Sequence, residues 1–486
     1  MTQPSFNLVS LAAAEMIREG FHPGFPAGTD EQIAAIRAAS TTAPGGDHRD
    51  LRGLWWSSID NDTSRDLDQI EAAERVAGGI RLLVGVAEVS RAVKKGTPID
   101  QHAADQTQTI YTAVRNFPML PNELSTDLTS LNENQDRAAV VVEMVVDAAG
   151  DVSQPKIYRA LVRNKAQLAY SKVGPWLEGT APPDAKVAAH PELQQQLKLQ
   201  DEAAQALHAG RVRCGALEFH RTEADPVVVD GKVQGLKAAI PNRATSLIEE
   251  LMVAANEVMA ETLRAAKRSC LRRVVKSPER WERIVELVRS HGTELPETPD
   301  STALNVFLRQ QRTADPDHYP DLALAIIKLM GPGEYVLLPG NAAAAPSHFG
   351  LAAHDYTHST APNRRFPDLV TQRVVKAMLA GAPAPYTDGE LESLAQHCTE
   401  REAAARKVQR TMAKREAAVA LAGHVGQTFR GVVTGANDKG TYVRVFDPPA
   451  EGRVVRGEAG LDVGDRVQVT LLHTDPVHAH IDFARS

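Results

Sequence analysis

The sequence predicts an α+β protein that ends in a separate, small β-barrel. Segments 81–90 and 138–147 are rich in Val, Leu and Ala and predict strands. Segments 185–209 and 244–268 predict helices, and the second of them repeats apolar residues at helical spacing. Residues 423–486 hold five short alternating stretches between Gly, Asn, Asp and Pro turns, which favours a five-stranded closed barrel of the OB type.

Length, composition and net charge limit the class of protein. A chain of 486 residues is long enough for two to four domains, and 43% hydrophobic residues is an ordinary globular value. The formal net charge of −7 excludes a protein that is basic throughout. The 54 Lys and Arg residues can still gather in a local channel that binds nucleic acid.

Cysteine usage and hydropathy predict the compartment. Cys214, Cys270 and Cys398 lie far apart and form no Cys-x-x-Cys pair, so neither a disulfide framework nor a structural zinc site is expected. The first 20 residues lack the pattern of a secretory signal peptide, and no run approaches the roughly 18 apolar residues that cross a bilayer. We therefore expect a cytoplasmic protein that makes no membrane contact.

The chain begins with a small helical region, residues 1–48. Two short helices are expected at 8–20 and 30–40 with a Pro- and Gly-rich turn between them, and a helix-turn-helix-like pair is one interpretation. A piece of this size has too little core of its own. We therefore expect it to dock on the mixed domain that follows, residues 49–385.

A long connector precedes the barrel. Residues 386–422 are rich in Ala, Glu, Arg and Lys, and the part from 390 to 422 contains neither Pro nor Gly. Its apolar heptads are irregular, which favours a rigid single helix over a coiled coil. The barrel then occupies residues 423–486.

The stretch "SIDNDTSRDLDQIE", residues 58–71, is the first candidate site. It places five acidic residues within twelve positions, and like charges this close repel unless something positive sits among them. Asp60, Asp66 and Asp68 could supply oxygen ligands for Mg²⁺, which takes a few carboxylates together with water and substrate phosphates. Two such ions about 4 Å apart can position a hydrolytic water and stabilise the leaving oxygen of a phosphodiester.

Two other interpretations of this stretch stay open. Counted from Asp60, its acidic residues fall close to the ligand positions of a helix–loop–helix calcium loop. Arg65 stands where that loop needs Gly, and a strand rather than a helix is predicted before Asp60. The remaining interpretation is a solvated acidic turn that holds no metal.

Residues 348–379 form the second candidate site. A polar run that contains histidines leads to Ala-Pro-Asn-Arg-Arg at 361–365, and an apolar helix with basic residues follows. Guanidinium groups bind phosphates bidentately, and a helix N-terminus adds backbone donors, so Arg364 and Arg365 suit phosphate recognition. A surface arginine pair that bridges to nearby acids is the alternative.

Together these segments resemble the RNase II family of exoribonucleases, whose catalytic domain is called RNB. The acidic stretch is similar to the family's metal motif, and "YTHSTAPNRRFPDLVTQR" at 356–373 is similar to its "YTHFTSPIRRYPDLVVHR" signature. Four further motifs match in the family's order: "NFPMLPNELSTDLTSLN", "NKAQLAYSKV", "GALEF" and "LIEELMVAAN". The resemblance covers about 50–380, and 423–486 resembles the RNA-binding OB barrel that ends these enzymes.

The resemblance implies roles for the charged residues. Asp60, Asp66 and Asp68 would be Mg²⁺ ligands, with two ions acting during catalysis and Mn²⁺ as an alternative ion. Asp68 would be the essential carboxylate. Arg364 would stabilise charge on the scissile phosphate, and Arg365 would contact RNA beside it.

The resemblance also implies a pocket for the RNA 3′ end. Tyr111 and Phe219 match the aromatic residues that hold the terminal bases from two sides. Glu249 matches an acid that contacts a ribose hydroxyl, although the adjacent Glu250 leaves this assignment open by one position. Aromatic faces hold any base, and hydroxyl contacts distinguish RNA from DNA. Ordinary core aromatics are the alternative for the two rings.

Three departures from the family pattern stand out. The family's acidic motif ends in two adjacent aspartates, but Gln69 occupies the second position, so a second ion is expected to bind less tightly; compensation by Glu71 or Asp62 is a hypothesis. Lys414 replaces a glutamate of the late helix, which puts the role of that glutamate in doubt here. Residues 1–48 stand where family members carry cold-shock barrels, which predicts a more open RNA entry.

The resemblance thus implies a Mg²⁺-dependent hydrolytic 3′→5′ exoribonuclease that degrades single-stranded RNA to nucleoside 5′-monophosphates. Its partners would be the 3′ ends of single-stranded RNA. No obligate protein partner is evident, and a monomer is expected. The alternative is an RNA-binding regulator of the same fold with impaired catalysis, an interpretation that Gln69 and Lys414 keep open.

Overall fold

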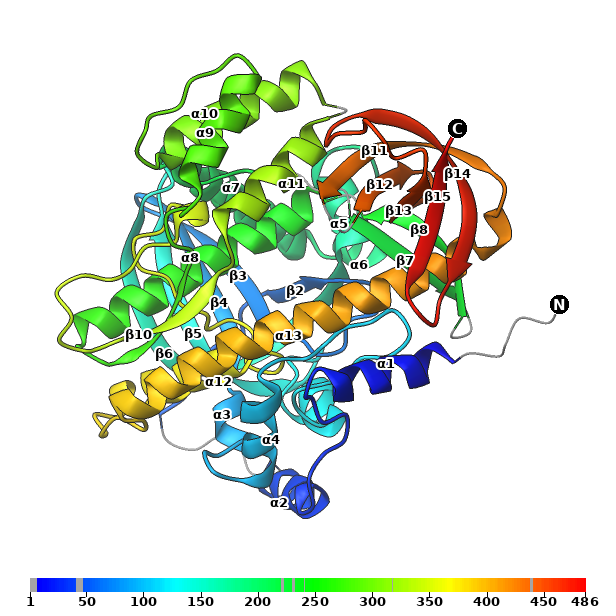
Figure 1. Cartoon of the computed structure of the whole chain (residues 1–486). Helices are drawn as coiled ribbons and strands as arrows, with labels where there is room; N and C mark the ends of the chain where they lie inside the picture. The colour runs from blue at the N-terminus through cyan, green and yellow to red at the C-terminus, as the bar shows by residue number, and fades with distance from the viewer. Residues whose placement is uncertain are drawn as a thin grey trace.

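A curved sheet with helices around it and a separate closed barrel make up the fold (Figure 1). The computed structural model describes residues 7–40, 47–219, 223–229, 232–239, 241–316, 318–437 and 440–486. Mixed helix and sheet followed by a five-stranded barrel confirms the fold class that the sequence predicts.

The central sheet has six strands in the order β1-β6-β2-β3-β4-β5, and the long β6 also pairs with β5, so the sheet bends back on itself. Strand β6 runs parallel to β1 and β2, and the other pairs are antiparallel. The strands are β1 Arg49–Asp50, β2 Trp56–Asp60, β3 Gln69–Val76, β4 Gly79–Ala87, β5 Asp136–Val146 and β6 Val152–Ala169.

Helices cover the sheet and carry the chain toward the barrel. They are α1 Leu8–Arg18, α2 Thr29–Ser40, α3 Val89–Ala92, α4 Pro98–Gln106, α5 Tyr170–Leu177, α6 Ala185–Ala189, α7 Pro191–Arg213, α8 Arg243–Ala265, α9 Trp281–Ser290, α10 Ser301–Ala314, α11 Tyr319–Met330, α12 Phe366–Leu379 and α13 Asp388–Leu421, with short turns η1 Glu123–Leu128, η2 Phe349–Leu351 and η3 Ala422–His424. The single helix predicted over 185–209 is wrong in one respect, because it is divided at His190. Pro191 starts α7, and a residue before proline is disfavoured in helical conformation.

The barrel closes in the order β11-β12-β13-β15-β14, because β11 pairs with both β12 and β14. Its strands are β11 Thr428–Asn437, β12 Gly440–Phe446, β13 Pro449–Arg456, β14 Arg466–Asp475 and β15 His480–Arg485. Two small antiparallel pairs complete the molecule: β7 Glu223–Val229 with β8 Lys232–Ala239, and β9 Cys270–Val274 with β10 Glu334–Leu338.

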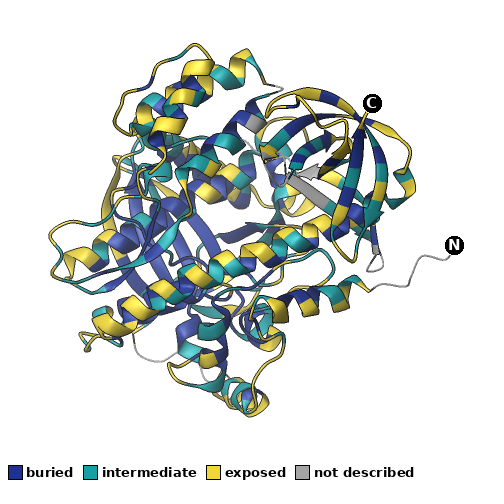
Figure 2. Ribbon diagram, in the orientation of Figure 1, coloured by how far each residue is buried: buried dark blue, intermediate teal, exposed yellow. Residues whose placement is uncertain are grey.

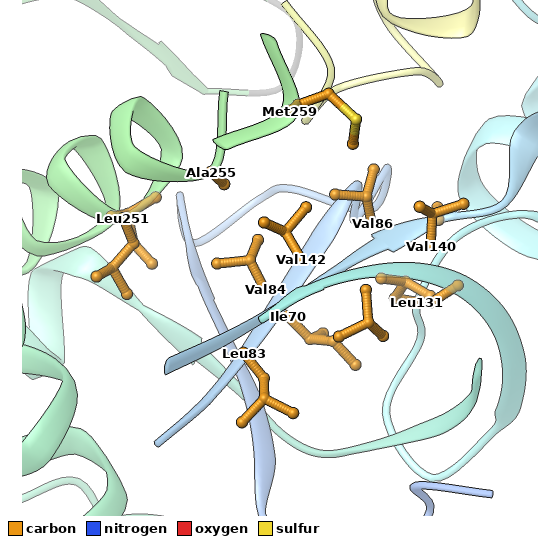
Figure 3. Packing of buried hydrophobic residues seen from close by; sticks show 14 of the residues in the cluster. Ile70, Leu83, Val84, Val86, Leu131, Val140, Val142, Leu251, Ala255 and Met259 are labelled. Carbon is orange, nitrogen blue, oxygen red and sulfur yellow. The ribbon is translucent and has the colours of Figure 1, made fainter. Parts of the chain in front are cut away.

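The main hydrophobic core lies between the sheet and its helices, and Figure 2 shows the sheet strands as mostly buried. In Figure 3, Val84 and Val86 of β4 lie on the side of the strands toward Met259 of α8. Gln69 and Glu71 of β3 pair with Val86 and Val84, and directly opposite residues of antiparallel strands share a face. Both polar residues therefore belong to the face of the sheet that α8 covers.

The N-terminal helices dock on the rest of the chain: α2 contacts α4 and η1 of the mixed domain, as expected, whereas α1 packs mainly on the connector helix α13. Ala12 and Met16 of α1 are fully buried against Val408 and Met412 of α13. The long α13 crosses the front of the molecule and continues to the barrel (Figure 1). In the part of the chain that the structure describes, no helix combines the length and the apolar character needed to cross a membrane.

Candidate active site

Asp68 is the most enclosed of the three aspartates that the sequence analysis singled out. It stands directly before β3 and is 1% exposed. Its Oδ1 accepts the backbone N–H of Asn363 at 2.8 Å, and its Oδ2 accepts Nε–H of Arg364 at 3.1 Å. The fold therefore brings together the two candidate sites, whose residues lie 295 positions apart in the chain.

Arg364 is positioned by the turn that precedes α12. The neighbouring Asn363 is fully buried, and its Oδ1 accepts the hydroxyl of Thr129 at 2.6 Å. Helix α12 starts two residues after Arg364, with Pro367 in its first turn, where a missing N–H costs nothing. The side chain of Arg364 is 45% exposed, so its terminal amino groups can reach a bound phosphate while Nε stays on Asp68.

Asp60 and Asp66 flank this pair from the strand and loop before β3. Asp60 is the last residue of β2, and its Oδ2 is buried without a hydrogen-bond partner. Burial raises the pKa of Asp60 to about 6; the charge of Asp66 adds to this effect, and that of Arg364 opposes it. Oδ2 of Asp66 accepts the hydroxyl of Tyr111 at 2.9 Å.

The same physics applies to Asp68. Burial raises its pKa to about 7, although Arg364 and the Asn363 N–H favour the ionised form. Carboxyl groups that hold protons near neutral pH carry less negative charge than their number suggests. A cation beside them would favour the ionised forms and release the protons.

A divalent cation fits this donor set. The carboxylate oxygens are hard ligands of the kind that Mg²⁺ takes, and the orphaned Oδ2 of Asp60 lacks the partner that a buried oxygen needs. Among the described residues, no three His, Cys, Asp or Glu side chains gather closely enough to hold a metal ion on their own. Water and substrate phosphate oxygens would complete the shell, which is the usual mode for Mg²⁺.

The calcium-loop interpretation is wrong. Asp60 ends strand β2 and Gln69 begins strand β3, so a strand, and not a helix, stands on each side of the loop. The solvated turn is also excluded for the end of the stretch, because Asp68, Gln69 and Glu71 are all buried. Of the five acidic residues in the stretch, only Asp62 is exposed and could belong to a solvated turn.

The two predicted aromatic residues lie in different surroundings. Tyr111 is 38% exposed and stands beside Asp66. Phe219 is half-buried and packs against the cluster formed by α9, α10 and α11. No ring contact joins the two side chains among the described residues.

The two adjacent glutamates of α8 differ sharply in environment. The Glu249 side chain is 66% exposed, with its Oε1 4.0 Å from Arg211. Glu250 is 4% exposed and accepts two hydrogen bonds from Arg211, at 2.6 and 2.7 Å, and one from His208 at 2.8 Å. Glu249 is therefore the member of the pair that faces outward.

Arg365 and Lys414 have contacts that the sequence analysis did not anticipate. Arg365 donates to Oδ1 of Asp368 at 2.8 Å, so part of its guanidinium serves the first turn of α12. Lys414 lies 6.0 Å from the ring centre of Tyr442 in the barrel. Asn363 and Asp368 were missed as positioning residues, although both belong to the quoted signature; nothing in their order along the chain says which oxygens they would contact.

Comparisons with known proteins agree with this geometry. The RNB domain model matches residues 48–381, and the model of the RNase II-type exonuclease C-terminal S1 domain matches residues 427–486. Ribonuclease R of Aquifex aeolicus is 30% identical over 465 residues, which cover 90% of this chain and 64% of that protein. Ribonuclease R of Escherichia coli is 29% identical over 445 residues, covering 88% of this chain and 54% of that protein. The chain thus spans between half and two thirds of the length of these relatives.

Solved structures show the same fold. Mycoplasma genitalium RNase R, in complex with ribose methylated single-stranded RNA, superposes with a TM-score of 0.87 at 22% identity and covers 99% of this chain and 78% of its own. Yeast Ssd1, described as a pseudonuclease, has a TM-score of 0.68 at 14% identity and covers 97% of this chain and 59% of its own. With the RNB domain matched over most of its length and the C-terminal S1 domain following it, the chain belongs to the RNB family of RNase II-type proteins.

Proposed function

We propose that this protein is a hydrolytic 3′→5′ exoribonuclease that uses Mg²⁺ to degrade single-stranded RNA to nucleoside 5′-monophosphates. One observation carries the proposal: the buried Asp68 pairs with a half-exposed Arg364 beside Asp60 and Asp66. This arrangement combines carboxylates for a divalent cation with a guanidinium for a phosphate. Membership of the RNB family and the Ribonuclease R relatives support the same reaction class.

Different residues would bind the cation and neutralise the charge of the phosphate. When bound at Asp60, Asp66 and Asp68, Mg²⁺ supplies positive charge at the scissile phosphate and a Lewis acid for water activation. Arg364 neutralises the negative charge that develops on the phosphate oxygens. Its Nε–H donates to Asp68, and this hydrogen bond fixes the orientation of the guanidinium group. In-line attack of water on phosphorus then breaks the last phosphodiester bond.

The protein would bind RNA through features that all nucleotides share: the base faces, the ribose hydroxyls and the backbone. Tyr111 would stack on a terminal base, and its hydrogen bond to Asp66 fixes the ring relative to the carboxylates. Phe219 would contact the terminal bases from another side, Glu249 would read a ribose hydroxyl, and Arg365 would contact the backbone. None of these contacts selects a base, so digestion without sequence preference is expected.

The proposal extends to the compartment and the assembly state. Cys214, Cys270 and Cys398 are all free thiols, which supports a reducing cytoplasm. The proposed partner is the 3′ end of single-stranded RNA, and the protein is proposed to act as a monomer.

The test is Asp68→Asn in the full chain. We expect hydrolysis of labelled single-stranded RNA to fall by at least about 10²-fold, because the carboxylate that orients Arg364 and serves the cation is lost. Binding of the same RNA, measured by fluorescence anisotropy, should change little. Wild-type protein should release mononucleotides with Mg²⁺ and none with excess EDTA.

Two results would overturn the proposal. Full activity of Asp68→Asn would remove the assigned role of the carboxylate. RNA binding by the wild-type protein without any mononucleotide release in Mg²⁺ or Mn²⁺ would instead identify an RNA-binding regulator with impaired catalysis.

A further inference from the structure

Glu71 is a buried carboxylate to which the proposed function gives no role. It lies in β3, is fully buried, and neither Oε1 nor Oε2 has a hydrogen-bond partner. The residue directly opposite it on β2, Ser57, is also fully buried, and its Oγ has no partner either. Among the described residues, Glu71 is the one buried carboxylate with both oxygens unpartnered.

Two other buried carboxylates, Glu88 and Glu250, are compensated. Glu88 contacts Lys376 at 2.5 Å and Arg159 at 2.9 Å, and Glu250 receives two hydrogen bonds from Arg211. A buried charge without such partners costs several kcal/mol or more. An uncompensated carboxylate in a well-formed sheet therefore requires an explanation, and a role in binding a cation is one that chemistry offers.

The position of Glu71 connects it to the candidate active site. It lies two residues beyond Gln69 on the same strand, and alternate residues of a strand share a face. Its partner Ser57 lies three residues before Asp60 on β2. Burial raises the pKa of Glu71, and the nearby charge of Asp60 raises it further. The charges of both carboxylates also raise the pKa of Tyr170, in which burial is again the main cause, so all three groups share one region.

Gln69 brings no negative charge to this region. Its side chain is buried at the first position of β3, where an amide oxygen can contact a cation but brings no negative charge. Oδ2 of Asp60 is also buried and unpartnered. Asp60 and Glu71 thus each have a buried oxygen without a partner, whereas Gln69, which lies between them in the sequence, is neutral.

Asp62 is the other acidic residue near this region. It is exposed, and its Oδ1 accepts the hydroxyl of Ser171 at 2.8 Å. Its charge is therefore solvated and hydrogen-bonded without a cation. Burial and missing partners distinguish Glu71 from Asp62.

We propose that Glu71 acts with Asp60 as a carboxylate of the divalent-cation site, supplying the charge that Gln69 lacks. The inference rests on the proposed function, because the cation is the Mg²⁺ or Mn²⁺ that hydrolysis would use. Glu71 lies two residues after Gln69 on the same face of β3, and its side chain is one methylene longer than that of an aspartate.

The experiment compares Glu71→Gln with wild-type protein in the absence of RNA. Mn²⁺ and Mg²⁺ are titrated calorimetrically, and thermal unfolding is followed with and without each cation. We expect cation affinity to fall by at least about 10-fold in Glu71→Gln, and the cation-induced rise in Tm to shrink with it. Without cation, the Tm of the variant should equal or exceed that of wild type, because an unpartnered buried carboxylate has been removed.

Two further variants sharpen the result. Asp62→Asn is the matched control and should leave cation affinity unchanged. The double variant Glu71→Gln with Gln69→Asp should recover affinity, because a carboxylate returns to the same face of β3. If Glu71→Gln does not fold, Glu71→Met offers an apolar side chain of similar length and carries the same expectation.

Cation affinity of the variants tests the role of Glu71, and RNA hydrolysis by the wild-type protein tests the proposed function. Equal cation affinity of Glu71→Gln and wild type, in a wild-type protein that hydrolyses RNA with Mg²⁺, overturns the inference and leaves the proposed function intact. A larger loss of affinity in Asp62→Asn than in Glu71→Gln also overturns it. Wild-type protein that neither binds the cations nor releases mononucleotides overturns both.

Discussion

At the scale of single residues, the buried Asp68 orients the guanidinium of Arg364 more than it stabilises the fold. Its pairing with Arg364 has to offset the cost of removing a carboxylate from water, and such pairs seldom add net stability. The arrangement instead holds a half-exposed guanidinium at one angle, with Asn363 fixing the other carboxylate oxygen. Preorganised charge of this kind costs no rearrangement when a phosphate arrives.

Tyr111 allows stacking to be separated from hydrogen bonding. Tyr111→Ala removes both the ring and the hydroxyl that contacts Asp66, whereas Tyr111→Phe removes the hydroxyl alone. We expect Tyr111→Ala to lose about 1–3 kcal/mol of RNA binding energy, because one base loses its stacking partner. Tyr111→Phe should keep most of that affinity. Anisotropy titrations with a short oligonucleotide measure both, and equal affinity of wild type and Tyr111→Ala would exclude the stacking role.

Glu88 gives the clearest link between one buried charge and stability. Burial alone would raise its pKa, but Lys376, His48 and Arg159 outweigh burial and lower the pKa in the folded protein. A carboxyl group with a lowered folded-state pKa contributes stability that is present above its unfolded pKa of about 4.5 and is lost as pH falls through the folded value.

Glu88→Gln should therefore destabilise the protein in a pH-dependent way. At neutral pH we expect a loss of roughly 3–5 kcal/mol, because the buried Lys376 loses its partner. The difference from wild type should shrink as the pH falls below 4.5. Urea unfolding at several pH values measures this difference, with Glu74→Gln, whose side chain is 61% exposed, as the control. A difference that is independent of pH would show that the lost interaction is not electrostatic.

At the scale of elements, side chains of α7 replace part of the strand pairing in the sheet. Strands β2 and β3 pair through Ser57 and Glu71. Beyond that point, Gln196 of α7 accepts the backbone N–H of Ala73 at 2.6 Å and donates to its carbonyl at 2.5 Å. Because α7 satisfies the backbone of β3 at Ala73, this part of the strand needs no partner strand on that edge.

Helix α1 has a comparable supporting role for the Tyr111 loop. Met16 is fully buried in a cluster that includes Ile110 and Phe117 on both sides of Tyr111 and Met412 of α13. Glu416 of α13 accepts the backbone N–H of a loop residue, Ala113, at 3.1 Å. The N-terminal helix and the connector helix thus hold the loop from two sides.

Met16→Ala tests this support. The cavity should cost about 2–5 kcal/mol and loosen the 110–117 loop that packs against it. Ile17→Ala is the matched control on the same helix, since Ile17 is 65% exposed. Hydrogen exchange should show faster exchange in 110–117 for Met16→Ala alone. Unchanged protection of this loop, with a lowered Tm, would limit α1 to a general stabilising role.

At the scale of the whole molecule, the barrel meets the RNB domain at a basic groove. A groove of about 640 Å³ lies between the start of α11 and the barrel, and its lining includes Arg430, Arg444, Arg466 and the half-exposed Phe446. Nε–H of Arg466 donates to Nε2 of His318 at 2.6 Å across this junction. A chain of net charge −7 thus keeps a local cluster of positive charge where upstream RNA would pass.

Arg430→Ala should weaken binding of long single-stranded RNA and lower the slope of log affinity against log salt by about 1, because one phosphate contact is lost. Hydrolysis of oligonucleotides too short to reach the barrel should stay at the wild-type rate. Arg289→Ala is the control, since Arg289 is an exposed arginine of α9 outside the groove. An unchanged salt slope would place upstream RNA elsewhere.

The sequence by itself determined the classes of element and the family. Alternation of apolar residues in 423–486 predicted a barrel, and the uninterrupted run 390–422 predicted a long helix, because both patterns are local and repeat with the geometry of the backbone. The acidic and Arg-rich motifs identified the family, since their residue types and spacing are specific. The break at Pro191 was also readable, and was missed only because the helical composition continues past it.

Only the tertiary structure decided which charges are compensated. Asp68 and Arg364 are close because two distant segments meet, and Glu71 differs from Asp62 because one faces a covered side of the sheet while the other faces solvent. Both are acidic residues of one short stretch, and their spacing says nothing about partners from elsewhere in the chain. Burial and ion pairing depend on contacts between segments far apart in sequence, which local pattern does not specify.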